Sequence, residues 1–230
     1  MTLYFDIETE PRPEAELREI CPPFDPDAVK TGNLKDAEKI AARIEEARAE
    51  HFANFADKAA LSPLLGQVCA IGWWAAEAAG TDCPTIIDCA PDEASGLAEF
   101  WDRLRRVNAD GGLTLCGFNT HGFDLPFLIK RSWIRGVPVP ALLRLERDRF
   151  WPEWNIDLRK IWQLGDAQGG GKLDDIARAL GVAGKSGQHG HEFGRLWRST
   201  TEDRELAREY LLQDVRLCRV LHGRLQWKAE

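Results

Sequence analysis

Two periods of apolar residues alternate along the chain, a period of about two and a period of three to four, which predicts a mixture of strands and helices. Short runs rich in β-branched and aromatic side chains are expected to form strands at 2–9, 66–75, 85–90, 113–119 and 156–162. Apolar residues at helical spacing predict helices over 92–106, 123–136, 172–181 and 201–227. This order of elements predicts an α/β fold in which helices cover both faces of a mixed sheet.

The stretch between the first two predicted strands is much longer than a simple connection. Residues 10–32 are Pro-rich and are expected to be irregular, because closely spaced prolines forbid a long helix. From Asn33, a residue type that caps helices, apolar residues recur at spacings of three and four, which predicts a helix over 34–60. We therefore expect one domain over 1–230 with a helical insertion at about 10–62. The helix 34–60 is expected to be a packing or dimer surface; a lid or a partner-binding arm is the alternative.

Composition and charge narrow the classes of protein. The chain has 230 residues, 44% of them hydrophobic, which is enough for a core. Its formal net charge of −7 disfavours a long, sequence-independent grip on duplex nucleic acid. A nuclease is not excluded, because a carboxylate metal site carries negative charge of its own that bound cations offset. Two further clusters are open to a substrate role, although a solvated surface is the simpler interpretation of both. They are the basic, Trp-containing stretch 130–154 and the histidines His189 and His191 of the loop 184–193.

Several features favour a cytoplasmic location. No apolar run approaches the roughly 18 to 20 residues that cross a bilayer, so no membrane association is expected. The first residues enter a strand-like run without a basic segment, which argues against a secretory signal. The six cysteines are scattered and form no CxxC pair, so we expect reduced thiols rather than a zinc site or a disulfide framework.

Acidic residues occur at three separated places that can carry metal chemistry. Asp6 and Glu8 stand two apart in a predicted strand and therefore face the same side. Asp124 lies where the strand 113–119 meets the next helix, and Tyr210 and Asp214 share one face of the last helix. Hard cations such as Mg²⁺ prefer oxygen ligands, and two of them can activate water and stabilise a leaving oxygen. The acidic residues therefore predict a magnesium-dependent phosphodiester chemistry.

Each of these motifs taken alone has an ordinary structural explanation. Acids are common at strand ends, Asp124 could cap its helix, and Tyr210 with Asp214 could be a plain helix face. Their joint occurrence, in this order and each on the expected element, favours the catalytic interpretation.

The complete pattern resembles the three motifs of DEDD-type exonucleases, which here are Asp6-x-Glu8, Asn119-x-x-x-Phe123-Asp124 and Tyr210-x-x-x-Asp214. The spacing of the tyrosine resembles the DEDDy branch. The segments FDIET and GFNTHGFDLPFL are similar to the proofreading exonuclease domain of B-family DNA polymerases and to the stand-alone predicted exonucleases related to it. The resemblance extends from residue 3 to about 220 and implies an RNase H-like fold, a five-stranded mixed sheet flanked by helices. The segment 10–62 departs from it.

The resemblance also implies roles for the metal-site residues. Asp6 would bridge two Mg²⁺ ions, for which Mn²⁺ could substitute, and Glu8 and Asp214 would complete the tighter site. Asp124 would hold the second ion, and Tyr210 would orient the attacking water.

The same resemblance implies which residues meet the substrate. Asn119 and Phe123 would line the 3′-terminal nucleotide, and the main chain at Thr9 would contact its sugar. Apart from the resemblance, Lys172 and Lys185 bracket a predicted helix and a polar loop, and this position makes them candidates for contact of one or the other with the DNA backbone.

The expected activity is hydrolysis of the 3′-terminal phosphodiester of single-stranded DNA, which releases nucleoside 5′-monophosphates. RNA stays open as a substrate, because no motif plainly reads or rejects a 2′-hydroxyl. The alternatives are an RNA-processing 3′-5′ exoribonuclease on the same scaffold and a non-catalytic interaction protein that binds through the segment 10–62.

Overall fold

The structure is a computed structural model that describes residues 1–75, 83–109, 111–143, 154–166, 169–184 and 192–225. The chain divides into two compact units. The larger contains Met1–Thr9 and Val68–Glu230, and the smaller contains Glu10–Gln67. The organisation of residues 1–230 as one domain with an insertion stays a prediction.

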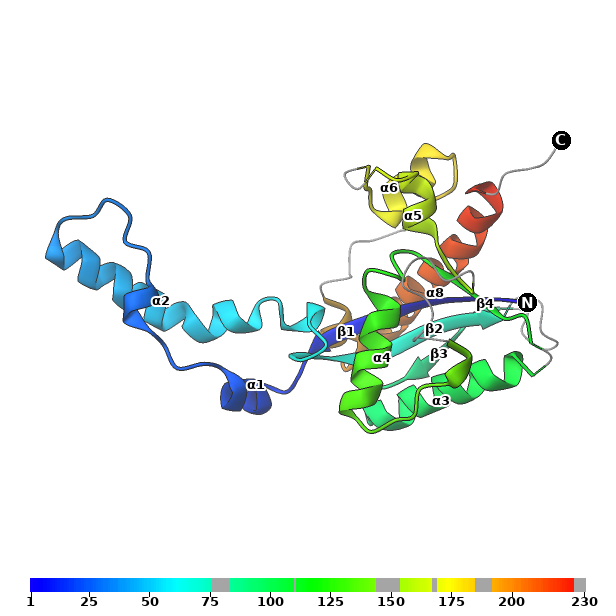
Figure 1. Ribbon diagram of the computed structural model, residues 1–230, viewed down its shortest axis with the longest axis horizontal. Helices are drawn as coiled ribbons and strands as arrows, with labels where there is room; N and C mark the ends of the chain where they lie inside the picture. The colour runs from blue at the N-terminus through cyan, green and yellow to red at the C-terminus, as the bar shows by residue number, and fades with distance from the viewer. Residues whose placement is uncertain (76–82, 110, 144–153, 167–168, 185–191, 226–230) are drawn as a thin grey trace. The chain divides into compact units, whose positions relative to one another are not determined.

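A five-stranded sheet forms the centre of the larger unit (Figure 1). Its strands, in spatial order, are β3 (Thr85–Asp88), β2 (Gly66–Ala75), β1 (Thr2–Pro11), β4 (Thr114–Gly117) and β5 (Asn155–Asp157). β1 pairs with β4, and β4 with β5, in parallel, whereas β2 and β3 are antiparallel. The sheet is therefore mixed, as predicted.

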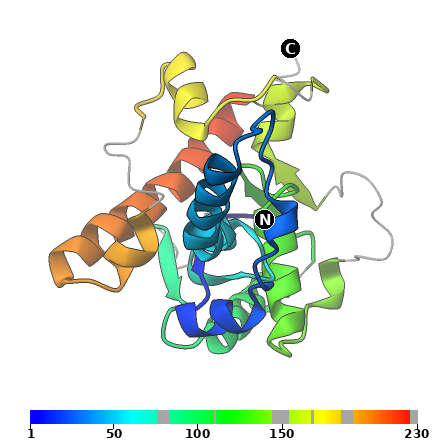
Figure 2. The same cartoon turned by 90° about the vertical axis from the view of Figure 1, so that its left-hand side faces the viewer.

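Alternate residues of β1 face two different cores, as the period of two requires. Leu3, Phe5 and Ile7 pack in a cluster with α3 (Glu93–Val107) and α4 (Asp124–Ile134). Tyr4 packs on the other face with α8 (Thr201–Leu225), and Figure 2 shows α4 and α8 on opposite sides of the sheet. Asp6 and Glu8 have the same parity as Tyr4, so β1 directs them toward the face that α8 covers.

Three shorter helices accompany α8: α5 (Leu158–Gln163), α6 (Leu173–Ala179) and α7 (Phe193–Trp197). The prediction of a strand over 156–162 is wrong beyond Asp157, where the chain turns into α5. The reason is local, because the side chain of Asp157 accepts hydrogen bonds from the backbone N–H groups of Arg159 and Lys160 and thereby starts a helix. The short helix α7 was not predicted.

A buried ion pair ties α3 and α4 to the sheet. Glu93 Oε1 accepts from Val68 N and from Arg131 Nε, both at 2.9 Å, and Arg131 Nη2 donates to Glu93 Oε2 at 2.6 Å. The two side chains are only 6% and 3% exposed. Since α4 begins at Asp124, this pair also fixes the helix that carries a candidate ligand.

Close approach of α8 to the sheet depends on Gly72 of β2. A Cβ atom at this position would lie 2.8 Å from Val215 Cγ2 and 3.0 Å from Leu211 Cγ. A residue with a side chain at position 72 would therefore push α8 away from β2.

The smaller unit contains α1 (Glu14–Ile20), α2 (Ala37–Ala56) and two short 3-10 helices, Pro26–Ala28 and Ala59–Leu61. The expectation of irregular chain over 10–32 is wrong for α1, which is short enough to fit between prolines. The predicted start at Asn33 is also wrong. Asp36 caps α2 instead, because its carboxylate accepts from the N–H groups of Glu38 and Lys39.

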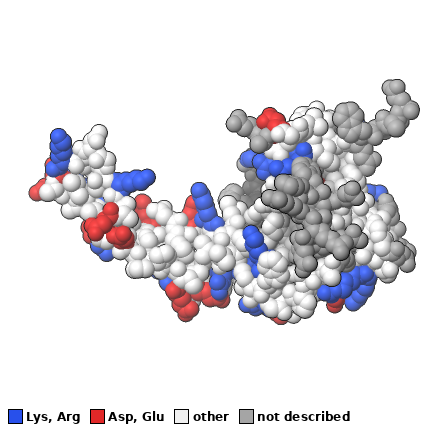
Figure 3. Space-filling model, in the orientation of Figure 1, with Lys and Arg blue, Asp and Glu red and all other residues white. Residues whose placement is uncertain are grey.

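The apolar stripe predicted on α2 is half-buried within this unit, and no residue of α2 is fully buried. Part of the stripe is covered by Phe24, whose ring centre lies 5.5 Å from that of His51. Acidic and basic side chains are mixed along the exposed faces of the helix (Figure 3). Among the residues that the structure describes, no helix is both long enough and apolar enough to cross a membrane.

Candidate active site

Three carboxylates from opposite ends of the chain meet on the α8 side of the sheet. Asp6 and Glu8 of β1 and Asp214 of α8 each offer a ligand oxygen, and these oxygens lie within 4.8 Å of one another. The strand supplies two of them because residues two apart share a face. The helix supplies the third because Gly72 lets α8 approach the sheet.

Asp124 lies beside this group. It is the first residue of α4 and 3% exposed, and its Oδ1 accepts a hydrogen bond from Ile7 N at 3.2 Å. Ile7 stands between Asp6 and Glu8, so Asp124, the fourth predicted carboxylate, is hydrogen-bonded to the strand that carries the first two. Helix α4 has no side-chain cap, and the capping explanation of Asp124 therefore fails.

The pKa of Asp124 is raised to about 7, chiefly by burial and to a lesser degree by the negative charges of Asp157 and Asp214, while the hydrogen bond from Ile7 acts in the opposite direction. A carboxyl held in this way is poised to exchange its proton for a cation near neutral pH.

The cluster suits a hard divalent cation. Its donors are all carboxylate oxygens, which Mg²⁺ and related ions prefer, and their spacing permits shared coordination. Without a cation, close like charges destabilise one another, and a bound cation removes that repulsion. The residues present therefore fit a divalent metal.

Tyr210 lies one helical turn before Asp214 on α8 and is half-buried. Its ring centre lies 6.4 Å from that of Phe193, and Phe193 stacks on Trp197 at 5.6 Å and 19°. Trp197 Nε1 in turn donates to Asp88 Oδ1 at 2.9 Å. Helix α7 thus packs against the ring of Tyr210, a contact that sequence patterns did not reveal.

The loop after β4 is built around Asn119, whose φ of 64° is in the left-handed region. Asparagine tolerates that region better than most residues. Its carbonyl accepts from Gly122 N at 3.0 Å and from Phe123 N at 2.9 Å. A Cβ atom at residue 122 would lie 2.6 Å from Asn119 Oδ1, so glycine is required where the side chain folds back.

Asp157 anchors this loop and is almost fully buried. Its Oδ1 accepts from Asn119 N at 2.9 Å, and its Oδ2 accepts from His121 N at 3.0 Å. The same carboxylate caps α5. Its contacts are those of a residue that positions the loop and the helix α5, and they differ from those expected of a metal ligand.

Arg159 was not singled out from the sequence, yet it reaches the site. Its Nη1 donates to Asn119 Oδ1 at 3.2 Å, which links α5 to the loop that leads to Asp124. Nothing in the pattern of residues distinguishes this arginine from one on an ordinary helix surface.

The other predicted substrate residues are placed as follows. Thr9 is half-buried on β1, and Phe123 is half-buried with its ring centre 5.3 Å from that of Phe127. Lys172 is exposed at the N-cap of α6. Lys185 lies outside the described residues.

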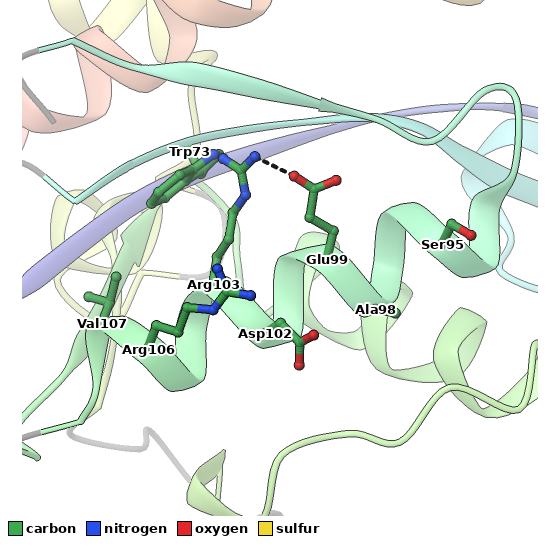
Figure 4. Close-up of a pocket in the computed structure, with 8 residues that line it drawn as sticks. All are labelled: Trp73, Ser95, Ala98, Glu99, Asp102, Arg103, Arg106 and Val107. Carbon is green, nitrogen blue, oxygen red and sulfur yellow. Dashed lines mark hydrogen bonds and ion pairs between the residues drawn. The ribbon is translucent and has the colours of Figure 1, made fainter. Parts of the chain in front are cut away.

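A separate cavity of about 720 Å³ lies along α3 (Figure 4). Trp73 lines it together with Arg103 and Arg106, and the guanidinium carbon of Arg103 lies 4.8 Å from the Trp73 ring centre. Trp73 belongs to the core cluster on the α3 side of the sheet, whereas Gly72 faces α8. The cavity contains none of the predicted site residues.

Comparison with known proteins identifies the family of this chain. Residues 61–227 match the model of a family described as predicted 3′-5′ exonucleases related to the exonuclease domain of PolB. The chain belongs to this family. Its family therefore classes the chain among the 3′-5′ exonucleases. The matched region begins after β1, so the inclusion of Asp6 and Glu8 rests on the geometry described above.

A solved structure of similar fold is the family B DNA polymerase from the hyperthermophilic archaeon Pyrobaculum calidifontis, with a TM-score of 0.57 and 20% identity. The similarity covers 97% of this chain and 24% of the polymerase chain. It confirms the RNase H-like fold of this exonuclease. No curated protein matches the chain.

Proposed function

We propose that the chain hydrolyses the 3′-terminal phosphodiester of single-stranded DNA by a two-metal-ion mechanism and releases nucleoside 5′-monophosphates. The observation that carries the proposal is the meeting of Asp6, Glu8 and Asp214 within 4.8 Å, with Asp124 hydrogen-bonded to the same strand.

In this proposal Asp6, Glu8, Asp124 and Asp214 hold two Mg²⁺ ions, with Mn²⁺ as a possible substitute. Such ions, when bound, lower the pKa of a water molecule and stabilise the charge of the leaving oxygen. Burial of Asp124 and Asp214 keeps competing water away from two of the ligands.

Tyr210 positions the attacking water. A tyrosine hydroxyl has a pKa of about 10, so it stays protonated at neutral pH and acts as a hydrogen-bonding group rather than as a base. Its place one turn before Asp214 on α8 supports this role.

The substrate strand is held on the β4 side of the cluster. Asn119 and Phe123 line the 3′-terminal nucleotide, the main chain at Thr9 contacts its sugar, and Lys172 and Lys185 meet the backbone. The fixed loop around Asn119 supports the first of these assignments, because a rigid loop orients a nucleotide without further ordering.

The smaller unit and the location complete the proposal. The helix predicted over 34–60, observed as α2, is proposed to bind a protein partner or a second copy through faces that its own unit leaves exposed. A cytoplasmic location is supported by the cysteines, all six of which are free thiols.

One assay with end-labelled oligonucleotides tests the activity. With Mg²⁺, a 5′-labelled DNA strand should shorten to a ladder, a 3′-labelled strand should release labelled mononucleotide from the start, and EDTA should stop both. Internal fragments from the 3′-labelled strand would contradict exonuclease action. Faster loss of matched RNA would favour the exoribonuclease alternative, and binding without cleavage would favour the interaction protein.

A further inference from the structure

Arg159 is a cation whose surroundings hold it in place without neutralising it. It is the second residue of α5, its backbone N–H donates to Asp157 Oδ1 at 3.0 Å, and its Nη1 donates to Asn119 Oδ1 at 3.2 Å. The side chain is half-buried. Its Nε is buried and has no hydrogen-bond acceptor among the residues that the structure describes.

No carboxylate in the described part of the chain pairs with this guanidinium. Arginines elsewhere do form such pairs, for example Arg195 with Glu192 at 2.9 Å and Arg216 with Glu209 at 2.8 Å. Asp157 is nearby in sequence, but its two oxygens are engaged by backbone N–H groups. Arg159 also stands in the first turn of a helix, where the helix dipole disfavours a cation. The unpaired positive charge of Arg159 therefore does not stabilise the free protein. A bound anionic ligand would compensate that charge.

The position of Arg159, next to the loop that leads to the candidate metal site, favours a phosphate of the nucleic-acid substrate as this anion. Asn119, its hydrogen-bond partner, begins the loop that reaches Asp124 five residues later, and the Asn119 carbonyl accepts from Phe123 N. A guanidinium is a planar fork with five N–H donors, so one edge can hold Asn119 while another binds two oxygens of a phosphate.

We propose that Arg159 is a substrate-binding residue whose guanidinium bridges the Asn119 side chain and a backbone phosphate of the strand entering the site. The proposal rests on the nuclease function proposed above. Because Arg159 occupies the carbonyl oxygen of the Asn119 amide, the Nδ2 group of Asn119 is left to donate toward the 3′-terminal nucleotide. Arg159 therefore acts by direct contact with a phosphate and also by orienting Asn119.

The test compares Arg159→Gln and Arg159→Lys with Arg105→Gln as a control. Arg105 lies on α3, where it pairs with Asp102, so its replacement changes the net charge equally at a remote place. Binding of a fluorescent single-stranded DNA is measured in EDTA by anisotropy over a series of salt concentrations, and KM and kcat are measured with Mg²⁺.

For Arg159→Gln we expect Kd and KM to rise about tenfold, as loss of a charged hydrogen bond implies, with little change in kcat. The slope of log Kd against log salt should fall by about 0.7, the value for one phosphate contact to a single strand. Arg159→Lys should keep the salt slope but recover only part of the affinity, because it lacks the fork that holds Asn119. Arg105→Gln should behave as the wild type.

Oligonucleotides with a single neutral methylphosphonate linkage locate the contact. One linkage near the 3′ end should weaken binding of the wild type and leave binding of Arg159→Gln unchanged. Equal weakening in both proteins at every linkage, or an unchanged salt slope in Arg159→Gln, would overturn the proposal even if activity fell, because a purely structural role would produce that result. If the wild type degrades DNA and Arg159→Gln has the same Kd and KM, this inference alone is overturned. A wild type that neither binds nor cleaves the strand would overturn the proposed function as well.

Discussion

The carboxylate of Asp124 and the backbone N–H of Ile7 are joined by a 3.2 Å hydrogen bond across 117 residues of chain. This bond places the acid that starts α4 against the strand that carries Asp6 and Glu8. A main-chain donor cannot rotate away, so the position of Asp124 is tied to the backbone of β1 rather than to a mobile side chain.

The raised pKa of Asp124 predicts opposite effects of pH on stability and on metal binding. Its folded-state pKa of about 7 exceeds the value of 3.8 for an exposed aspartate. The stability that this gives the metal-free protein is fully present below the lower value and is lost as pH rises through about 7. Metal binding requires the ionised form, so Mn²⁺ affinity should fall by up to about tenfold per pH unit below 7.

Titration of Mn²⁺ by calorimetry between pH 5.5 and 8.5, beside urea unfolding of the metal-free protein, checks both effects. Asp124→Asn keeps an oxygen that can accept from Ile7 N but cannot ionise, so both pH dependences should flatten. If Mn²⁺ affinity and stability of this variant depended on pH as in the wild type, the titrating group would be a residue other than Asp124.

Removal of a clustered carboxylate should abolish turnover without unfolding the protein. Asp6→Asn and Asp214→Asn are each expected to lower kcat by ~10³-fold or more, about 4 kcal/mol of transition-state stabilisation. The melting temperature without metal should stay or rise, because a repulsive charge is gone. Kinetics with a 5′-labelled strand and thermal melts measure the two quantities. Full Mg²⁺-dependent activity in Asp6→Asn would refute the metal-site assignment.

Tyr210→Phe should slow the reaction less than loss of a ligand. The change removes one hydroxyl and leaves the ring against Phe193. Loss of one neutral hydrogen bond costs about 1 kcal/mol, which is roughly fivefold in kcat. Single-turnover rates at saturating Mg²⁺ provide the measurement, and a decrease as large as that of Asp214→Asn would show that the phenol does more than position water.

Gly72→Ala should displace α8 and thereby damage the site from a distance. The added methyl group would meet Val215 Cγ2 at 2.8 Å, and such overpacking costs about 1 to 3 kcal/mol. Because α8 carries Tyr210 and Asp214, metal affinity and kcat should fall together with stability. Gly223→Ala on the same helix is the matched control, because a Cβ atom at position 223 would meet no other atom within 4 Å. This variant is expected to raise the free energy of unfolding by up to ~1 kcal/mol.

The buried pair of Glu93 and Arg131 predicts strong coupling between the two residues. Arg131→Met leaves the buried Glu93 with only the half-exposed Arg135, 3.6 Å away, as a cationic partner among the described residues, and should cost about 3 kcal/mol in the free energy of unfolding. The double change to Glu93→Gln and Arg131→Met should cost less than the sum of the single changes. Urea unfolding of all four proteins measures this coupling, and additive costs would show that the two side chains act independently.

The sequence predicted most strands and the longer helices because these depend on periodicity, whereas the grouping of all four acids in one site was implied by the resemblance to DEDD-type exonucleases. Alternation over residues 2–9 placed Asp6 and Glu8 on one side of a strand, and a spacing of four placed Tyr210 over Asp214. The structure confirms both placements. The predicted roles of the site residues stay predictions that the experiments above address.

Other features depend on contacts between residues remote in sequence, and periodicity does not encode them. Asp157 ends β5 and starts α5 because it binds backbone N–H groups on two separate segments. Arg159 contacts the predicted site through its hydrogen bond to Asn119, 40 residues away. The left-handed backbone at Asn119 follows from the hydrogen bonds of its loop. Helix α1 was missed because closely spaced prolines suggest a loop even where seven helical residues fit between them.

The contribution of α8 to the acidic cluster has a consequence for the nascent protein. A ribosome makes β1 long before α8, so the ligand oxygen of Asp214 arrives only after all five strands of the sheet have been translated. Until α8 docks over Gly72, Asp6 and Glu8 lack their third neighbour, and the growing polypeptide has an incomplete cation site. The proposed hydrolytic site would thus be completed only when α8 emerges, after every strand that supports it has been made.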